Sequence, residues 1–103
     1  MARVLAVTRL RVAEERKVEY LAVLTELERL GRARGRHLWV FQGSEEPNLL
    51  LEFSESASEA DHRAVCPATG READLEARRR ALVTPEGPTE PLWRELPLPS
   101  LAG

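Results

Sequence analysis

The stretch HLWVFQGSEEPNLLLEFS, residues 37–54, decides the fold of this chain. Two runs within it, 37–42 and 48–54, are rich in aromatic and branched side chains and contain neither glycine nor proline. The loop between them, GSEEP, has a glycine, a proline and two acidic residues. This pattern predicts two antiparallel strands joined by an exposed hairpin connection.

Both faces of this predicted hairpin carry large apolar side chains. Because side chains alternate along a strand, His37, Trp39 and Phe41 share one face of the first strand, and Leu38 and Val40 share the other. An antiparallel hairpin normally keeps one face polar and in contact with water. Helices can cover only one of these two faces, so a second structure must cover the other.

A strand and a long helix are predicted before the hairpin. Residues 3–12 are rich in β-forming side chains and contain no glycine or proline. Residues 14–34 have acidic side chains in the first turn and arginines in the last turn, which suits a helix dipole. The predicted apolar stripe of this helix consists of Val18, Leu21, Leu24, Leu27 and Leu30, widened by Tyr20 and Val23.

Helices and one further strand are predicted after the hairpin. In order, these elements are a helix from Ser56 or Ser58 to about 66, a helix from Thr69 to about Leu82, a Pro/Gly linker at 83–91, a last strand at 92–96 and a loose tail at 97–103. The prolines on both sides of the last strand confine it to a sheet edge or to an exchange across an interface.

This element order predicts a single α+β domain over residues 1–103. Strand, helix, two strands, helices and strand make a split βαββαβ unit of the ferredoxin-like kind, with an antiparallel sheet and both helices on one face. The apolar side chains on the other face predict that a second copy of the chain packs against it, because a two-fold dimer is the commonest way to cover such a face.

The composition indicates which partners and which cellular location to expect for this protein. The net charge of −2 gives no general attraction to nucleic acid or to an anionic membrane, and no apolar segment is long enough to span a bilayer. Cys66 is the single cysteine, so an intrachain disulfide is impossible and a cytoplasmic location is expected. Heavy use of arginine, leucine, alanine and glutamate is typical of a GC-rich bacterial genome.

Four segments carry a resemblance to a known superfamily: the strand VLAVTRLRV, the amphipathic helix, the HLWVFQ/NLLLEFSES hairpin and the helix start SEADHRAV. Over about residues 3–66 the chain resembles the dimeric α/β-barrel superfamily. That superfamily includes the antibiotic-biosynthesis-monooxygenase-like proteins. The resemblance implies a homodimer whose facing sheets enclose small apolar cavities. Some members of the superfamily oxidise polycyclic phenols or quinols without a cofactor, some degrade haem, and many have no established activity. The haem-degrading members rely on an Asn late in the first strand, where this chain has Thr8 and Leu10, so haem degradation is not expected.

Candidate ligand-binding residues follow from the aromatic side chains. A cavity between helices and sheet is predicted, lined by Trp39, Phe41, Tyr20 and Trp93. His37 or Arg9 could then meet an oxygen of an aromatic substrate. The alternative interpretation is that His37, Trp39 and Phe41 form the aromatic core of a dimer interface.

Two further titratable residues are candidates for catalysis. Glu52 lies mid-strand among apolar residues, where desolvation would make it a candidate base, or it pairs as a structural ion pair with Arg9, Arg11 or Arg94. His62 could shuttle protons, or it is simply solvated. The chain has too few histidines and cysteines for a metal site, and none is expected.

Two functional hypotheses remain open from sequence. The first is a cofactor-free monooxygenase-like homodimer that binds a small aromatic or quinol-type ligand. The second is a non-enzymatic homodimeric module with a regulatory or protein-interaction role. A cavity with a few convergent polar groups would favour the first, and a filled interior with all polar groups paired would favour the second.

Overall fold

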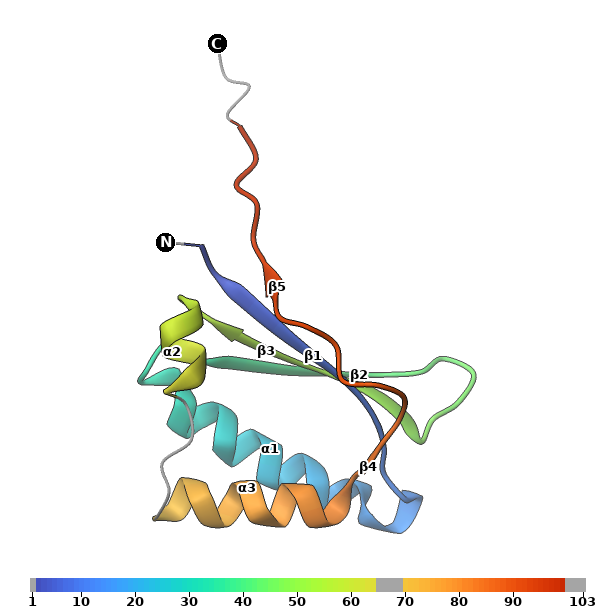
Figure 1. Ribbon diagram of the computed structural model, residues 1–103. Coiled ribbons are helices and arrows are strands. Elements are labelled where there is room, and N and C mark those ends of the chain that lie inside the picture. The colour runs from blue at the N-terminus through green and yellow to red at the C-terminus, as the bar shows by residue number, and fades with distance from the viewer. Residues whose placement is uncertain (1, 65–69, 100–103) are drawn as a thin grey trace.

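An antiparallel sheet lies against a layer formed by two antiparallel helices in the computed structural model, which describes residues 2–64 and 70–99 (Figure 1). The elements are β1 Val4–Arg11, the short 3-10 turn η1 Glu14–Arg16, α1 Lys17–Arg32, β2 His37–Gln42, β3 Leu49–Ser56, α2 Glu59–Arg63, α3 Arg71–Leu82, β4 Thr84–Pro85 and β5 Trp93–Arg94. This is the α+β, ferredoxin-like arrangement that the sequence predicts.

The sheet is built around β1, which pairs on both sides. Its strand order is β2-β3-β1-β4, with β5 also paired to β1. β3 pairs with β1 along the whole length of both strands, and β2 pairs with β3 along the whole of β2. The hairpin loop is closed where the Gly43 N–H donates to the Leu49 carbonyl at 2.9 Å.

Two short strands share the second edge of β1. β4 pairs with Leu10 and Arg11, and β5 pairs with Val4 and Leu5. β4 falls inside the predicted linker 83–91, and β5 is shorter than the predicted strand 92–96. Prolines lack the N–H that a ladder needs, so the proline-rich segment pairs only in short pieces.

The buried face of α1 differs from the predicted stripe. Tyr20, Val23, Leu24 and Leu27 are buried, but Val18, expected in the stripe, is 81% exposed. Residues three apart advance 300° around a helix, so a strict three-residue repeat drifts by about 60° per step. The face that stays against the sheet follows alternating steps of three and four residues instead.

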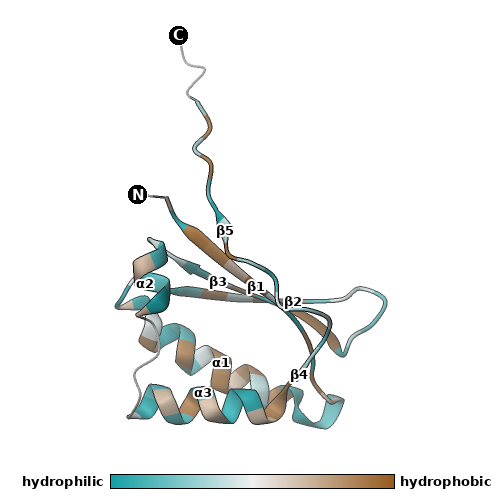
Figure 2. Ribbon diagram, viewed as in Figure 1, coloured by the Kyte–Doolittle hydropathy of each residue, from teal (hydrophilic) through white to brown (hydrophobic). Residues whose placement is uncertain are grey.

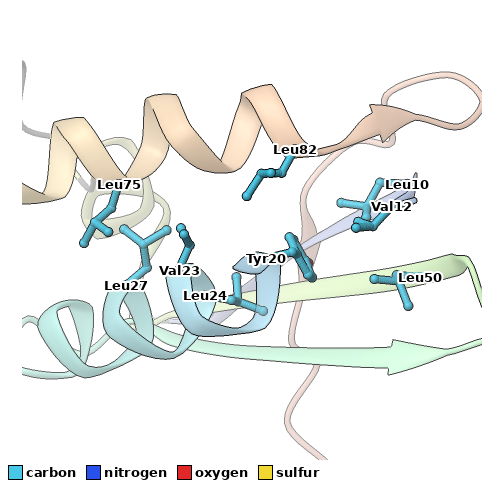
Figure 3. Close-up of a cluster of buried hydrophobic side chains, with 9 residues drawn as sticks. All are labelled: Leu10, Val12, Tyr20, Val23, Leu24, Leu27, Leu50, Leu75 and Leu82. Carbon is cyan, nitrogen blue, oxygen red and sulfur yellow. The ribbon is translucent and has the colours of Figure 1, made fainter. Parts of the chain in front are cut away.

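Nine buried apolar side chains form the core between sheet and helices (Figure 3). They are Leu10, Val12, Tyr20, Val23, Leu24, Leu27, Leu50, Leu75 and Leu82. They come from β1 and the segment after it, from α1, from β3 and from α3, so each layer contributes. Full burial of one such side chain is worth about 1.5–3 kcal/mol, and this cluster therefore fixes the helices on this face.

The starts of α2 and α3 follow local chemistry. Ser58 caps α2, because its Oγ accepts the Asp61 N–H at 3.1 Å. α3 begins after Gly70, whose φ of 92° is a left-handed conformation that glycine adopts without strain. The predicted cap Thr69 and the lone Cys66 lie outside the described residues.

The face of the sheet away from the helices, called the open face below, is apolar and uncovered. Trp39, Phe41 and Trp93 are 45%, 58% and 52% exposed. Figure 2 shows the first half of β1 in brown, in keeping with a strand that presents apolar side chains to both faces. The helix layer lies entirely on the other side (Figure 1).

No helix in the described parts of the chain is long and apolar enough to cross a membrane.

Replacing Leu27 by alanine should lower the free energy of unfolding by about 2–5 kcal/mol, because Leu27 is fully buried between the layers and the change leaves a cavity. Chemical denaturation measures this. The matched control is Val18→Ala on the same helix, which should change stability by no more than about 0.5 kcal/mol. Equal effects of the two changes would contradict the observed orientation of α1.

Candidate functional site

The sheet divides the predicted site residues into two groups. Arg9, His37, Trp39, Phe41 and Trp93 lie on the open face, because they occupy register positions that share one side of the sheet. Tyr20 and Glu52 lie on the side that the helices cover, where both are buried. His62 is on α2.

This arrangement corrects the expectation of one cavity lined by Trp39, Phe41, Tyr20 and Trp93. Tyr20 belongs to the core under the helices, whereas the other three aromatic residues lie on the opposite surface of the same sheet. A single protomer therefore cannot bring all four rings to one ligand. The sequence predicted the face of each strand residue but not the way α1 turns relative to the sheet.

Three rows of side chains cross the open face. They are Phe41, Leu51 and Arg9; Trp39, Phe53 and Val7; and His37, Glu55, Leu5 and Trp93. The first two rows are apolar except for Arg9. The third row begins with two polar side chains, His37 and Glu55, and continues with two apolar ones, Leu5 and Trp93. The open face is thus a mainly apolar surface with a few polar groups at its ends.

The aromatic rings of the open face contact one another in pairs. The ring of Phe41 meets Phe53 edge to face, with centroids 5.3 Å apart and an interplanar angle of 87°. The His37 imidazole and the Trp39 indole are tilted by 32° with centroids 6.2 Å apart. Such edge and tilted contacts leave ring faces available for stacking by another aromatic group.

His37 stands at the rim of the open face, next to a carboxylate. Its Nδ1 lies 3.7 Å from Oε2 of Glu28 on α1. The hydrogen bond from Arg32 and the charge of Arg32, and more weakly the Leu38 N–H, lower the pKa of Glu28 against the opposing effect of burial. Glu28 is therefore an ionised carboxylate beside the His37 ring.

Arg9 lines a hollow at the hairpin end of the open face. The hollow has a volume of about 200 Å³. Its lining residues are Arg9, Phe41, Gln42, Gly43, Leu49, Leu50 and Leu51. The walls are aliphatic and aromatic, and Arg9 supplies the one charged side chain among these lining residues.

A polar cluster lies inside the protein, between β3 and the helices. The Tyr20 hydroxyl donates to Oε2 of Glu52 at 2.5 Å, and Nη1 of Arg79 donates to Oε1 of Glu52 at 3.0 Å. Arg79 also donates to Glu76 from Nε at 3.2 Å and from Nη2 at 3.1 Å. Arg36 extends the cluster, with Nη2 at 3.7 Å from Glu76.

The electrostatics of this cluster keep the Tyr20 phenol and the Arg79 guanidinium protonated. Burial, together with the charge of Glu52, raises the pKa of the Tyr20 phenol, so the hydroxyl stays protonated and donates. Burial alone would lower the pKa of Arg79, but the charges of Glu52 and Glu76 outweigh it and raise that pKa. Both oxygens of Glu52 are engaged by donors, as in a structural ion pair.

Glu52 has a different partner from those that the sequence suggested. Arg9 lies on the other face of the sheet, Arg11 binds Glu86 and Glu46 on that same face, and Arg94 is 3.8 Å from Glu59. The real partner, Arg79, comes from α3. The sequence pattern could have indicated this partner. Arg79 is four residues after Leu75 and three before Leu82, so it lies on the buried stripe of α3.

His62 and Arg36 have buried nitrogen atoms without hydrogen-bond partners. These atoms are Nδ1 of His62, and Nε and Nη2 of Arg36. His62 is half-buried at the end of the sheet that α2 covers. Within residues 2–64 and 70–99, no three His, Cys, Asp or Glu side chains gather in a way that could hold a metal ion.

Solved structures of other proteins have a fold similar to that of this chain. No protein-family model and no curated protein sequence matches the chain. SnoaB, a cofactor-independent oxygenase from Streptomyces nogalater, is similar in structure with a TM-score of 0.71 at 15% identity, and the match covers 100% of both chains. A conserved protein from Methanosarcina mazei matches with a TM-score of 0.73 at 17% identity, over 93% of this chain and 95% of that one.

A putative antibiotic biosynthesis monooxygenase from Chloroflexus aurantiacus matches with a TM-score of 0.68 at 17% identity, over 97% of this chain and 96% of that one. The protein thus has the α+β fold of the antibiotic-biosynthesis-monooxygenase-like proteins. The resemblance inferred from the sequence is confirmed at the level of the fold.

Tyr20, the only tyrosine, should not ionise in the native protein at the ordinary tyrosine pKa of about 10. Phenolate absorbance should appear only on alkaline unfolding, whereas in denaturant it should titrate normally. The unfolded chain loses this proton first, so stability should fall as the pH rises above about 10 and should not depend on Tyr20 below it.

The matched variant for this titration is Glu52→Gln, which removes the neighbouring negative charge. Its Tyr20 should ionise more easily than in the wild type but still above the ordinary range, because burial is the larger cause of the raised pKa. Native wild-type Tyr20 ionising near pH 10 would show that the phenol is not enclosed by this cluster.

Proposed function

We propose that this protein is a cytoplasmic homodimer of the cofactor-independent monooxygenase type, which binds a small aromatic or quinol-type ligand at its open face. The observation that carries the proposal is the exposure of Trp39, Phe41 and Trp93 on one surface of the sheet. A cytoplasmic location is part of the proposal because the single Cys66 allows no intrachain disulfide.

A second copy of the chain is the partner that best covers this surface. Soluble monomers rarely expose large continuous apolar patches, and rings in such patches gain about 1.5–3 kcal/mol each when they are buried. A two-fold dimer joins the same patch of both copies. Packing the two open faces together would shield the exposed rings of both protomers from water.

The open face also has the chemistry to hold an aromatic ligand. The rings of Trp39 and Phe41 offer stacking surfaces, and the hollow beside Arg9 is apolar with a charged end. The His37 imidazole could accept a proton from a phenol that lies against Trp39. Similarity in fold to SnoaB, a cofactor-independent oxygenase, supports this type of reaction.

A non-enzymatic homodimeric module is the second candidate, and one observation favours it. Nine apolar side chains pack between helices and sheet, where Glu52 is held by Tyr20 and Arg79. A hollow of about 430 Å³ between α1 and β2 is a space that a ligand on this side of the sheet could use. No free base remains at Glu52. In this case the open face would serve assembly alone, and the role would be regulatory or one of protein interaction.

Trp39→Asp should convert the dimer to a monomer, because it places a charge in the middle of the apolar interface. Sedimentation velocity at micromolar concentration measures the change. The matched control is Val18→Asp, which puts the same charge on an exposed apolar position of α1 and should leave the dimer intact. A wild-type protein that sediments as a monomer would refute the assembly.

Quinols and polycyclic phenols should raise the melting temperature of the wild-type protein. Ligand at about 100 times Kd stabilises a fold by ~2.7 kcal/mol. Oxygen consumption with the same compounds, without added cofactor, tests turnover, and His37→Gln should reduce it while keeping the thermal shift. A dimer with neither stabilisation nor oxygen uptake would favour the non-enzymatic module.

A further inference from the structure

The charged side chains of the open face are paired almost completely. Arg3 binds Glu95 at 2.8 Å and Glu55 at 3.4 Å. Arg11 binds Glu86 and Glu46, each at 2.9 Å. The four carboxylates near the ends of the face are therefore engaged by two arginines.

Arg9 is the exception on this face. It lies between Val7 and Arg11 along β1, and within residues 2–64 and 70–99 it makes neither an ion pair nor a side-chain hydrogen bond. Its neighbour across the sheet is Leu51, followed by Phe41. The guanidinium thus stands exposed in an apolar row, with no carboxylate of its own.

Covering the open face would change the environment of Arg9. An arginine that is transferred from water into an apolar interface keeps its charge, since its pKa is too high for it to become neutral. An unpaired buried charge is strongly unfavourable, so the guanidinium needs an anion there. A guanidinium forms two parallel hydrogen bonds best with a carboxylate.

The hollow next to Arg9 sets the size of the group that carries this anion. Its volume of about 200 Å³ is below the range of pockets for drug-sized ligands, about 300–1,000 Å³. Phe41 forms one wall, already edge-on to Phe53 at 5.3 Å, and Leu49 and Leu51 form another. One aromatic ring fits this shape and polarity.

We infer that the ligand of the open face is a single-ring aromatic carboxylate, whose ring occupies the hollow beside Phe41 and whose carboxylate pairs with Arg9. This inference rests on the proposed function, because it takes the open face to be covered by a second copy. It narrows the aromatic ligand to an anion and assigns Arg9 the recognition of its charge.

Calorimetric titration of the wild-type protein with benzoate and with benzamide tests the inference. The two probes share ring and shape, but only benzoate is an anion. Benzoate should bind at least tenfold more tightly than benzamide, and its affinity should fall as salt is raised. Arg9→Gln should remove this preference, and Arg9→Lys should keep part of it because lysine retains the charge but not the planar fork.

The matched control is Arg80→Gln, since Arg80 is also an exposed arginine without an ion pair in the described chain and the change in net charge is the same. It should leave benzoate binding unchanged. Equal binding of both probes, with no effect of Arg9→Gln on a stable dimer, would overturn the inference but leave the proposed function standing.

Two other results would also overturn the inference. Benzoate failing to bind while Arg9→Gln weakens the dimer would show that a carboxylate of the second copy pairs with Arg9, which overturns the inference. A monomeric wild-type protein that binds neither probe would overturn the proposed function and this inference together.

Discussion

The alternation of side chains along β2 and β3 is the constraint on which the rest of this structure depends. Leucine, valine and aromatic residues occupy consecutive positions in both strands, so the sheet must carry apolar groups on both faces. The helices cover one face with a nine-residue core. The other face keeps Trp39 and Phe41 about half exposed. The proposed dimer and the proposed ligand site both arise from this asymmetry between the two faces.

The same sheet separates two kinds of polar chemistry. On the helix side, Tyr20, Glu52 and Arg79 satisfy one another, and such a closed network stabilises a single arrangement of the core. On the open face, Arg9 stays exposed and unpaired next to an apolar hollow. A buried charge with good partners points to a structural role, whereas an unpaired charge at an apolar surface points to binding. This contrast is why the open face, and not the Glu52 cluster, is the stronger candidate for function.

Much of the fold was predictable because its signals are local. The bounds predicted for β2 are those observed, and Ser58 caps α2 as one of the two proposed serines. The stripe of α1 was predicted less well. A helix has 3.6 residues per turn, so residues spaced by three gradually rotate away from the face that is buried against the sheet. The pairing of the two short strands β4 and β5 with β1 depends on the path of a proline-rich segment, which no local pattern specifies.

In the candidate site, side chains that share a strand face could be predicted from the sequence, but contacts between different elements could not. By itself the sequence determined which side chains share a strand face, and so it placed His37, Trp39 and Phe41 together; alternation is a property of the backbone. Only the tertiary structure decided that Tyr20 lies on the far side of the sheet from those rings, and that Glu52 meets Arg79. These contacts join residues 27 or more positions apart, and they depend on how a helix is rotated on a sheet, which is set by the packing of the whole core.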